Sequence, residues 1–253
     1  MNNTLTNGFK ILEYLAETAK PHSIKELAEA FKLPNSHICR LLKTLTETGY
    51  VEQEKGNRKY KVSLKILRLS NACIKRMEIR NRVRPYADKL SRELNQAVYL
   101  AAPHEGHALI VDVLYPGGVS NDASQAIGNL NIAHTTASGK ICAAYQEDID
   151  SYLETIELFK ITDKTITDKK LFKLELEKIR REKVAVTDSE KGDGVAALAC
   201  PLFNCNGEFV GGIGSMLPPG EHSSEQWDTF KEKIKEAAES ASFALGYSLQ
   251  NLV

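Results

Sequence analysis

The sequence predicts an α+β protein in two parts, a helical N-terminal head followed by a larger body that mixes helices and strands. Two observations support this division. Apolar residues recur at helical spacing in three short segments before residue 50, whereas strand-like runs separated by turns lie between residues 97 and 215. The chain has 253 residues, 42% of them hydrophobic and 26% charged, which fits a globular protein of one large or two modest domains.

The head is expected to start with two helices. Apolar spacing predicts the first helix over residues 5–19, and Pro21 ends it. Ser23 and Glu26 then form a capping box, because the serine hydroxyl accepts a hydrogen bond from a first-turn amide while the glutamate reaches back to the cap residue. The second helix therefore begins after Ser23, and it ends at a break over residues 32–34.

A third helix follows this break and ends before Gly49, a residue suited to the left-handed position after a helix. Its inward side carries apolar residues at helical spacing, namely Ile38, Leu41, Leu42 and Leu45. Residues 50–62 then predict a hairpin with a basic tip. Two short helices joined by a tight turn and followed by a hairpin are typical of a winged helix-turn-helix, so we expect residues 1–62 to form a DNA-binding domain.

The outward side of the third helix carries side chains that can contact DNA. At about 100° per residue, Ser36, Arg40 and Lys43 face outward and His37 lies at the edge of this face. Arg40 can pair with a guanine, whereas Lys43 suits a phosphate. With two residues of the hairpin tip added, the candidate DNA-binding residues are Ser36, His37, Arg40, Lys43, Arg58 and Lys59. The alternative is a solvated face on a winged helix that binds only protein.

Basic residues are concentrated in residues 55–84, which contain eleven Lys or Arg and one Glu, whereas residues 1–54 and 85–253 have net charges of −1 and −9. Such a block suggests a polyanion partner, and the alternative is a solvated basic helix. Apolar spacing over residues 63–84 is weak and predicts a connecting helix that ends before Pro85, because proline disfavours a helical residue before it. We therefore expect the body to comprise residues 85–253.

The body is expected to combine strands and helices. Strand patterns cover residues 97–103, 108–114, 184–187, 195–203 and 208–215, and helical patterns cover residues 137–146 and 168–183. A last helix begins at Ser223, which forms a second capping box with Gln226. Its predicted buried residues follow at helical spacing and are Trp227, Phe230, Ile234, Ala237, Ala241 and Leu245.

Several segments match one family in order and in spacing. They are residues 23–28, 33–37, 40–45 and 49–51 of the head, and His134–Lys140, Asp188–Glu190 and residues 194–203 of the body. Together these segments resemble the winged-helix head and the body of IclR-type bacterial transcriptional regulators. The resemblance covers essentially the whole chain.

This resemblance implies a body related to the GAF/PAS-like fold, with a curved antiparallel sheet flanked by helices. It implies a homodimer formed through the heads, often paired into a homotetramer, on a pseudo-palindromic operator in double-stranded DNA. We therefore expect a ligand-responsive transcriptional regulator, a repressor, whose operator binding is modulated by a small-molecule carboxylate. The resemblance implies no enzymatic activity and no cofactor.

The expected effector site lies at the start of the helix at residue 137. The first amides of a helix lack helical partners and its dipole is positive there, so a carboxylate is a suitable guest. By resemblance, the effector-binding residues are Thr136, Ala137, Ser138, Thr187, Asp188, Ala197, Gly214 and Met216.

Four of these positions depart from residues common in the family. Some family members have a polar residue where this chain has Gly214 and Met216, some have cysteine where it has Ala197, and aspartate is common at the position of Thr187. The pocket is therefore less polar, which favours a sugar acid or an aromatic acid over a glyoxylate-like guest. Alternatively, Thr135 and Thr136 cap the helix, and Asp188 and Glu190 satisfy a turn.

Other patterns carry weaker signals. His104 and His107 flank an expected turn, and a metal site would need further ligands, so no metal is expected. Cys200 and His134 form a conceivable nucleophile pair, but no motif supplies an oxyanion hole, which leaves an enzyme as the less favoured alternative. Five cysteines without a C-x-x-C pair, together with the lack of a membrane-length apolar run or a signal segment, lead us to expect a cytoplasmic protein.

Overall fold

The computed structural model describes residues 2–18, 20–118, 127–217 and 223–248. The chain divides into two compact units, residues 1–76 and residues 77–253, which we call the head and the body. Each unit has its own buried core, so each is described separately below.

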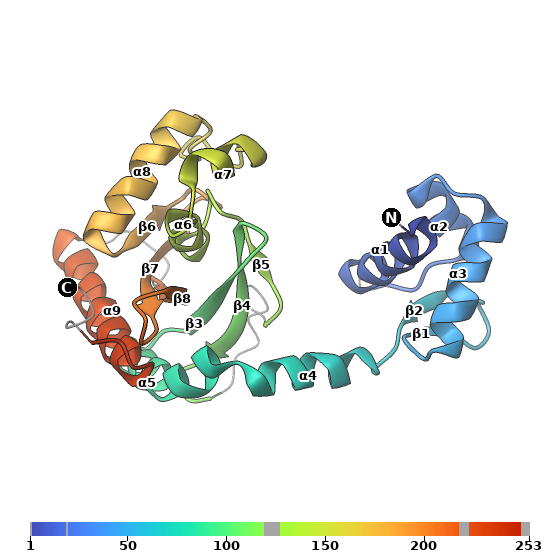
Figure 1. Cartoon of the computed structure of the whole chain (residues 1–253), viewed down its shortest axis with the longest axis horizontal. Helices are drawn as coiled ribbons and strands as arrows, with labels where there is room; N and C mark the ends of the chain where they lie inside the picture. Colours follow the sequence, from blue (N-terminus) through green and yellow to red (C-terminus); the bar gives the residue numbers. More distant parts are fainter. Residues whose placement is uncertain (1, 19, 119–126, 218–222, 249–253) are drawn as a thin grey trace. The chain divides into compact units, whose positions relative to one another are not determined.

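The head is a winged helix-turn-helix, which confirms the sequence prediction (Figure 1). Its elements are α1 (Asn3–Glu17), α2 (Ile24–Phe31), α3 (Asn35–Glu47), β1 (Val51–Gln53), β2 (Tyr60–Val62) and α4 (Ile66–Arg76). Strands β1 and β2 form the antiparallel wing, with Val51 opposite Val62. The core contains the predicted inward residues of α2 and α3, among them Leu27, Ile38 and Leu42. In α1 the predicted inward face is only partly confirmed, because Ile11 and Leu15 are buried whereas Leu5 and Phe9 are exposed.

The capping box at the start of α2 is present and ties this helix to the wing. The Ser23 amide donates to Glu26 at 2.6 Å, and the Lys59 ammonium lies 3.2 Å from the same carboxylate. These two hydrogen bonds favour the charged carboxylate and lower the pKa of Glu26 from 4.5 to about 2. A carboxylate with a lowered pKa stabilises the fold at pH values above its unfolded pKa, and this contribution is lost as the pH falls toward 2.

We expect Glu26→Gln to lower the melting temperature of the head at pH 7 by more than at pH 3. The glutamine keeps a hydrogen-bond acceptor for the Ser23 amide but loses the charge that faces Lys59. Calorimetry of the full chain at both pH values measures the two differences. A difference between wild type and variant that is equal at pH 7 and pH 3 would contradict this account of the Glu26 carboxylate.

The connecting segment differs from the prediction of a single helix ending before Pro85. Helix α4 ends at Arg76, and a new helix, α5 (Glu78–Leu94), begins after Met77 and continues through Pro85. An internal proline costs a helix about 3 kcal/mol. Helix α5 offsets this cost because it buries Val83, Leu90 and Leu94, and each such side chain contributes about 1.5–3 kcal/mol.

The body contains one six-stranded antiparallel sheet in the order β5-β4-β3-β8-β7-β6. Its strands are β3 (Val98–His104), β4 (His107–Leu114), β5 (Leu130–Asn131), β6 (Ala185–Asp188), β7 (Ala196–Phe203) and β8 (Phe209–Met216). The helices that follow α5 are α6 (Ala137–Ala144), α7 (Ile149–Thr155), α8 (Lys169–Glu182) and α9 (Ser224–Ala244). The predicted strands and helices are confirmed within one or two residues, whereas β5 and α7 have no counterpart among the predictions.

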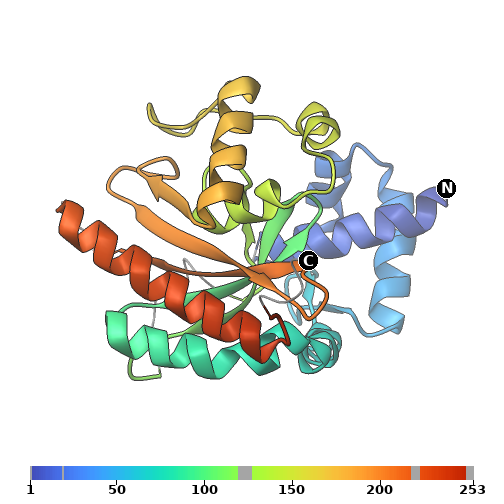
Figure 2. The same cartoon turned by 60° about the vertical axis from the view of Figure 1, so that its left-hand side comes forward.

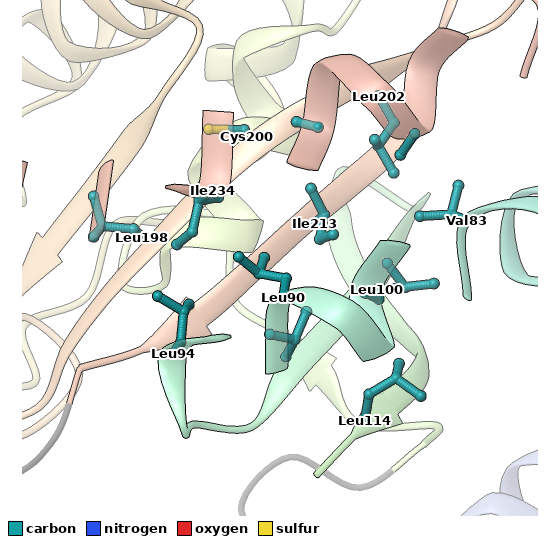
Figure 3. Packing of buried hydrophobic residues seen from close by; sticks show 14 of the residues in the cluster. Val83, Leu90, Leu94, Leu100, Leu114, Leu198, Cys200, Leu202, Ile213 and Ile234 are labelled. Carbon is teal, nitrogen blue, oxygen red and sulfur yellow. The ribbon is translucent and has the colours of Figure 1, made fainter. Parts of the chain in front are cut away.

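Two groups of helices cover the two faces of this curved sheet. Helices α5 and α9 lie side by side along one face (Figure 2), and α6 packs on the other face together with α8. Figure 3 shows the core under α5 and α9, where Leu90 and Ile234 meet Leu100, Ile213 and neighbouring strand residues.

The capping box at Ser223 and Gln226 starts α9 as predicted. The predicted α9 residues Ile234, Ala241 and Leu245 are buried, whereas Trp227, Phe230 and Ala237 are only partly covered. Among the residues that the structure describes, no helix is long and apolar enough to cross a membrane.

Candidate DNA-binding and effector sites

Helix α3 presents the predicted recognition face to solvent. Ser36, Arg40 and Lys43 are exposed, while Ile38 and Leu42 are fully buried on the opposite side. This orientation follows from the helical spacing of the apolar residues, which fixes the face that packs on α1 and α2. The three polar side chains are therefore free to reach a groove of DNA.

Two local contacts hold the side chains of this face. Arg40 donates to the Nδ1 atom of His37 at 3.2 Å, so His37 lies beside Arg40 at the edge of the face. Lys43 and Glu47 form an exposed ion pair at 3.9 Å, one helical turn apart. Exposed pairs of this kind contribute about 0–1 kcal/mol, so Lys43 is easily released to a phosphate.

The two cations of the wing are in different environments. Lys59 turns back to the Glu26 carboxylate of α2, whereas Arg58 is exposed at the wing tip with a left-handed backbone (φ 57°). Within the described part of the chain, no carboxylate lies within ion-pair distance of Arg58. Arg58 is therefore the wing cation that is available to DNA, while binding by Lys59 would require it to leave Glu26.

The basic block of residues 55–84 is split between the two units, and part of its charge is neutralised internally. In the body, the carboxylate of Asp112 is buried and forms ion pairs with Arg80 and Arg84. In the head, Lys61 pairs with Glu52 and Glu54. The net charge of this block therefore overstates the positive surface that a polyanion would meet.

Thr136 caps the N-terminus of α6. The Thr136 hydroxyl accepts a hydrogen bond from the Gly139 amide at 3.1 Å and donates to the Ile132 carbonyl at 2.8 Å. Gly139 has to be glycine, since a methyl group there would overlap the Ile132 carbonyl oxygen and the Thr136 hydroxyl. Thr136 is therefore a helix cap, whereas the buried hydroxyl of Thr135 has no partner among the described residues.

Three of the predicted effector residues form one row across neighbouring strands. Thr187 on β6 pairs with Ala197 on β7, and Ala197 pairs with Met216 on β8. Ala137 belongs to the same apolar cluster as Ala197 and Met216, so this row lies on the face of the sheet on which α6 packs. The structure thus brings together four of the eight residues that the resemblance indicated.

Gly214 lies on the same face, next to this row, and is covered by a residue that the sequence analysis missed. A Cβ atom on Gly214 would lie 2.6 Å from the ring of Tyr99. The buried Tyr99 hydroxyl donates to the Leu198 carbonyl at 3.3 Å, and burial raises the pKa of this hydroxyl. Alternation along β3 was the available signal, because it places Tyr99 on the face opposite that of Val98 and Leu100.

Two other predicted effector residues have their side chains engaged elsewhere. Ser138 accepts a hydrogen bond from Asn131 at 2.9 Å, and exposed Asp188 pairs with Lys164 at 3.1 Å. The Ser189 hydroxyl also donates to Asp188 at 2.8 Å. These contacts match the turn-satisfying alternative for Asp188.

A buried ion cluster fixes α6 against the segment after β6. Lys140 is 1% exposed, and its ammonium lies 2.7 Å from Glu190 and 3.5 Å from Glu175. Burial raises the pKa of Glu190, although the Lys140 charge opposes this shift. Lys140 is not among the predicted site residues, although a lysine inside an otherwise small and apolar helix is a signal for it.

The two residues of the conceivable nucleophile pair lie apart, and His107 is engaged by a backbone amide. Cys200 belongs to the core under α5 and α9, whereas His134 packs against Phe172 on the other face of the sheet. Burial also raises the pKa of the Cys200 thiol to about 12, so the thiol is protonated at neutral pH. His107 accepts a hydrogen bond from the Ala133 amide, and the described residues contain no group of three metal-ligating side chains.

Comparison with known protein families matches both units. Residues 4–55 match the IclR helix-turn-helix domain, and residues 71–243 match the C-terminal domain of bacterial transcriptional regulators of the IclR type. An uncharacterized HTH-type transcriptional regulator of Haemophilus influenzae is 29% identical over 97% of this chain and 94% of its own length. The relatives are described as regulators rather than enzymes.

Solved structures share the fold over nearly the whole chain. The IclR protein of Thermotoga maritima is 27% identical, with a TM-score of 0.72 over 98% of this chain and all of its own. An IclR homologue of Microbacterium hydrocarbonoxydans, complexed with 4-hydroxybenzoate, has a TM-score of 0.78 at 16% identity, over 97% and 100% of the two chains. This chain therefore belongs to the IclR family of bacterial transcriptional regulators, with a DNA-binding helix-turn-helix head and a ligand-binding body.

Proposed function

We propose that this regulator is a repressor that binds a pseudo-palindromic operator as a homodimer or a dimer of dimers in the cytoplasm. The observation that carries the proposal is the exposed face of α3 with Ser36, Arg40 and Lys43. Arg40 reads a guanine edge in the major groove, Lys43 contacts a phosphate, and Ser36 contacts either. His37 holds Arg40, and Arg58 contacts the backbone or the minor groove beside the wing. Lys59 joins these contacts when it leaves Glu26.

The effector is a small organic acid that lies between the start of α6 and the row of Thr187, Ala197 and Met216. The amides of Ala137 and Ser138 occupy the first positions of the helix, and Thr135, whose hydroxyl has no partner in the described part of the chain, precedes them closely in the sequence. Because Ala197, Met216 and the Tyr99 ring are apolar, the acid carries a ring or chain as well as a carboxylate. The 4-hydroxybenzoate in the solved homologue supports an aromatic acid over a sugar acid.

Effector binding changes DNA affinity through the difference between its affinities for two arrangements of the protein. The acid contacts one face of the sheet, and α5, which follows α4 along the chain, packs on the other face. A change in the curvature of the sheet therefore shifts α5, which is joined to the head through α4. Repression is relieved when the acid-bound arrangement separates or rotates the two heads.

Selection of DNA from a random pool by the full chain tests the DNA-binding part of this proposal. We expect enriched sequences with two related half-sites, and affinity that falls steeply as salt rises because bound protein releases counterions. Equal binding of all sequences, or affinity that does not depend on salt, would reject an operator-specific regulator.

A thermal-shift screen of the full chain against aromatic acids and sugar acids tests the effector. A ligand at about 100 times its Kd adds about 2.7 kcal/mol of stability. Thr187→Val removes one hydroxyl at constant shape and is expected to raise the Kd about threefold to tenfold, which corresponds to one hydrogen bond. Thr167→Val, an exposed substitution before α8, is the matched control. If both variants changed the Kd of the effector equally, Thr187 would not be part of the effector site.

A further inference from the structure

The body contains a cavity that is lined by the end of α8 and reaches the face of the sheet covered by α5 and α9. It has a volume of about 560 Å³ and lies between the end of α8, strand β7 and the last turns of α9. Cys200 on its wall belongs to the core under α5 and α9, so the sheet separates this cavity from the proposed effector site. Its size falls in the range of about 300–1,000 Å³ that small-molecule sites occupy.

The walls of this cavity are largely apolar and aromatic. Cys200, Phe203 and Ala238 line it from β7 and α9, and the Phe203 and Tyr247 rings lie 5.4 Å apart. Phe243 also lines the cavity and is 74% exposed, a high value for a phenylalanine on a helix that otherwise packs on the core. Such walls favour a guest with an aromatic ring.

The polar groups around the cavity are mostly cations and donors. Arg181, Lys183 and Lys235 line it, and in the described parts of the chain no carboxylate lies within ion-pair distance of them. Two acids also line the cavity, Glu182 and Glu239. Glu182 already pairs with Lys231 at 3.9 Å, so Glu239 is the lining carboxylate that offsets the three cations. The lining therefore has an excess of positive charge toward a bound guest.

Ser242 adds a hydrogen-bond donor to these cations. Its buried hydroxyl oxygen accepts from the Phe203 amide at 3.2 Å. For the hydroxyl hydrogen, no acceptor is found among the described residues. Because a serine hydroxyl can donate one hydrogen bond, this hydrogen is available to a guest in the cavity.

We propose that this cavity is a second small-molecule site of the body, for an aromatic organic anion. The ring of the guest packs between Phe203, Phe243 and Ala238, and its carboxylate or sulfonate faces Lys183 and Lys235. The inference is independent of the proposed effector site, since the two sites share none of the residues named for them and lie on opposite faces of the sheet.

Titration of the full-length protein with 8-anilinonaphthalene-1-sulfonate tests the site, because this probe is an aromatic anion that fluoresces when it is desolvated. We expect saturable binding that benzoate displaces and benzyl alcohol does not. The double substitution Lys183→Gln with Lys235→Gln should raise the Kd of the probe about fivefold or more, since each exposed ion pair contributes modestly. Lys178→Gln, which removes a charge from α8 outside the cavity, is the matched control.

A second pair of variants tests the aromatic wall without disturbing the core. Phe243→Ser should also raise the Kd of the probe, whereas Leu174→Ser removes an exposed apolar side chain of α8 outside the cavity and should not. Equal effects of the target and control variants would overturn the proposal. Probe binding that disappears as the protein concentration rises would also overturn it, because the cavity would then be covered by a second copy of the chain.

Discussion

Replacing Lys140 with methionine is expected to lower the free energy of unfolding by about 3–5 kcal/mol, the usual cost of removing one partner from a buried ion pair. Lys140 is 1% exposed and lies between the Glu190 and Glu175 carboxylates, at 2.7 and 3.5 Å. Methionine fills similar space but leaves two neighbouring carboxylates without their cation. The stability of the start of α6, where the proposed effector binds, therefore depends on this lysine.

Urea unfolding of Lys140→Met, Glu190→Gln and the double variant measures this effect. We expect the double variant to be more stable than the sum of the two single losses predicts, because no unpaired charge is left between Lys140 and Glu190. Lys164→Met is the matched control, since Lys164 forms an exposed pair with Asp188 and should cost less than about 1 kcal/mol. If Lys140→Met and Lys164→Met lowered the free energy of unfolding equally, the buried ion pairs of Lys140 would contribute no more to stability than the exposed pair of Lys164.

Arg40→Ala is expected to weaken operator binding by about 1–3 kcal/mol, or roughly tenfold to a hundredfold, and to relax the preference for one base pair in each half-site. Arg40 is exposed on the outward face of α3 and is positioned by His37 at 3.2 Å. The substitution removes a side chain that makes no contact with the buried core, so the head should remain folded.

Binding assays with the selected operator and its single-base variants measure both parts of this prediction. Lys43→Ala should weaken binding to all sequences by a similar factor and reduce the salt slope by about one, as expected for a phosphate contact. Lys10→Ala, an exposed change on α1, is the control for an altered net charge. If Arg40→Ala binds operator and unrelated DNA as the wild type does, α3 does not read bases through Arg40.

The helices and the wing of the head could be predicted from the sequence because their signals are local, although the buried face of α1 was predicted only in part. The Ser23–Glu26 capping box and the spacing of Ile38, Leu41 and Leu42 each involve residues within one or two helical turns. Such patterns fix both the existence of a helix and the face that it buries. The outward position of Ser36, Arg40 and Lys43 followed directly from the same spacing.

The connecting segment was predicted incorrectly because its outcome depends on distant residues. Pro85 is a local signal against a helix, but α5 buries Val83, Leu90 and Leu94 under the sheet and α9. Burial of these side chains outweighs the hydrogen bond that proline cannot donate. A sequence pattern in residues 63–84 contains no information about the strands that cover α5.

By itself, the sequence determined the winged head, the order of most strands and helices, and the identity of the residues that face outward on α3. Only the tertiary structure decided which charges are neutralised, as Arg84 and Lys140 are by Asp112 and Glu190, and which ring covers Gly214. The physical reason is the range of the interactions. Hydrogen bonds of caps and the spacing of helical faces act between near neighbours in the chain, whereas burial and ion pairing depend on residues that folding brings together from distant segments.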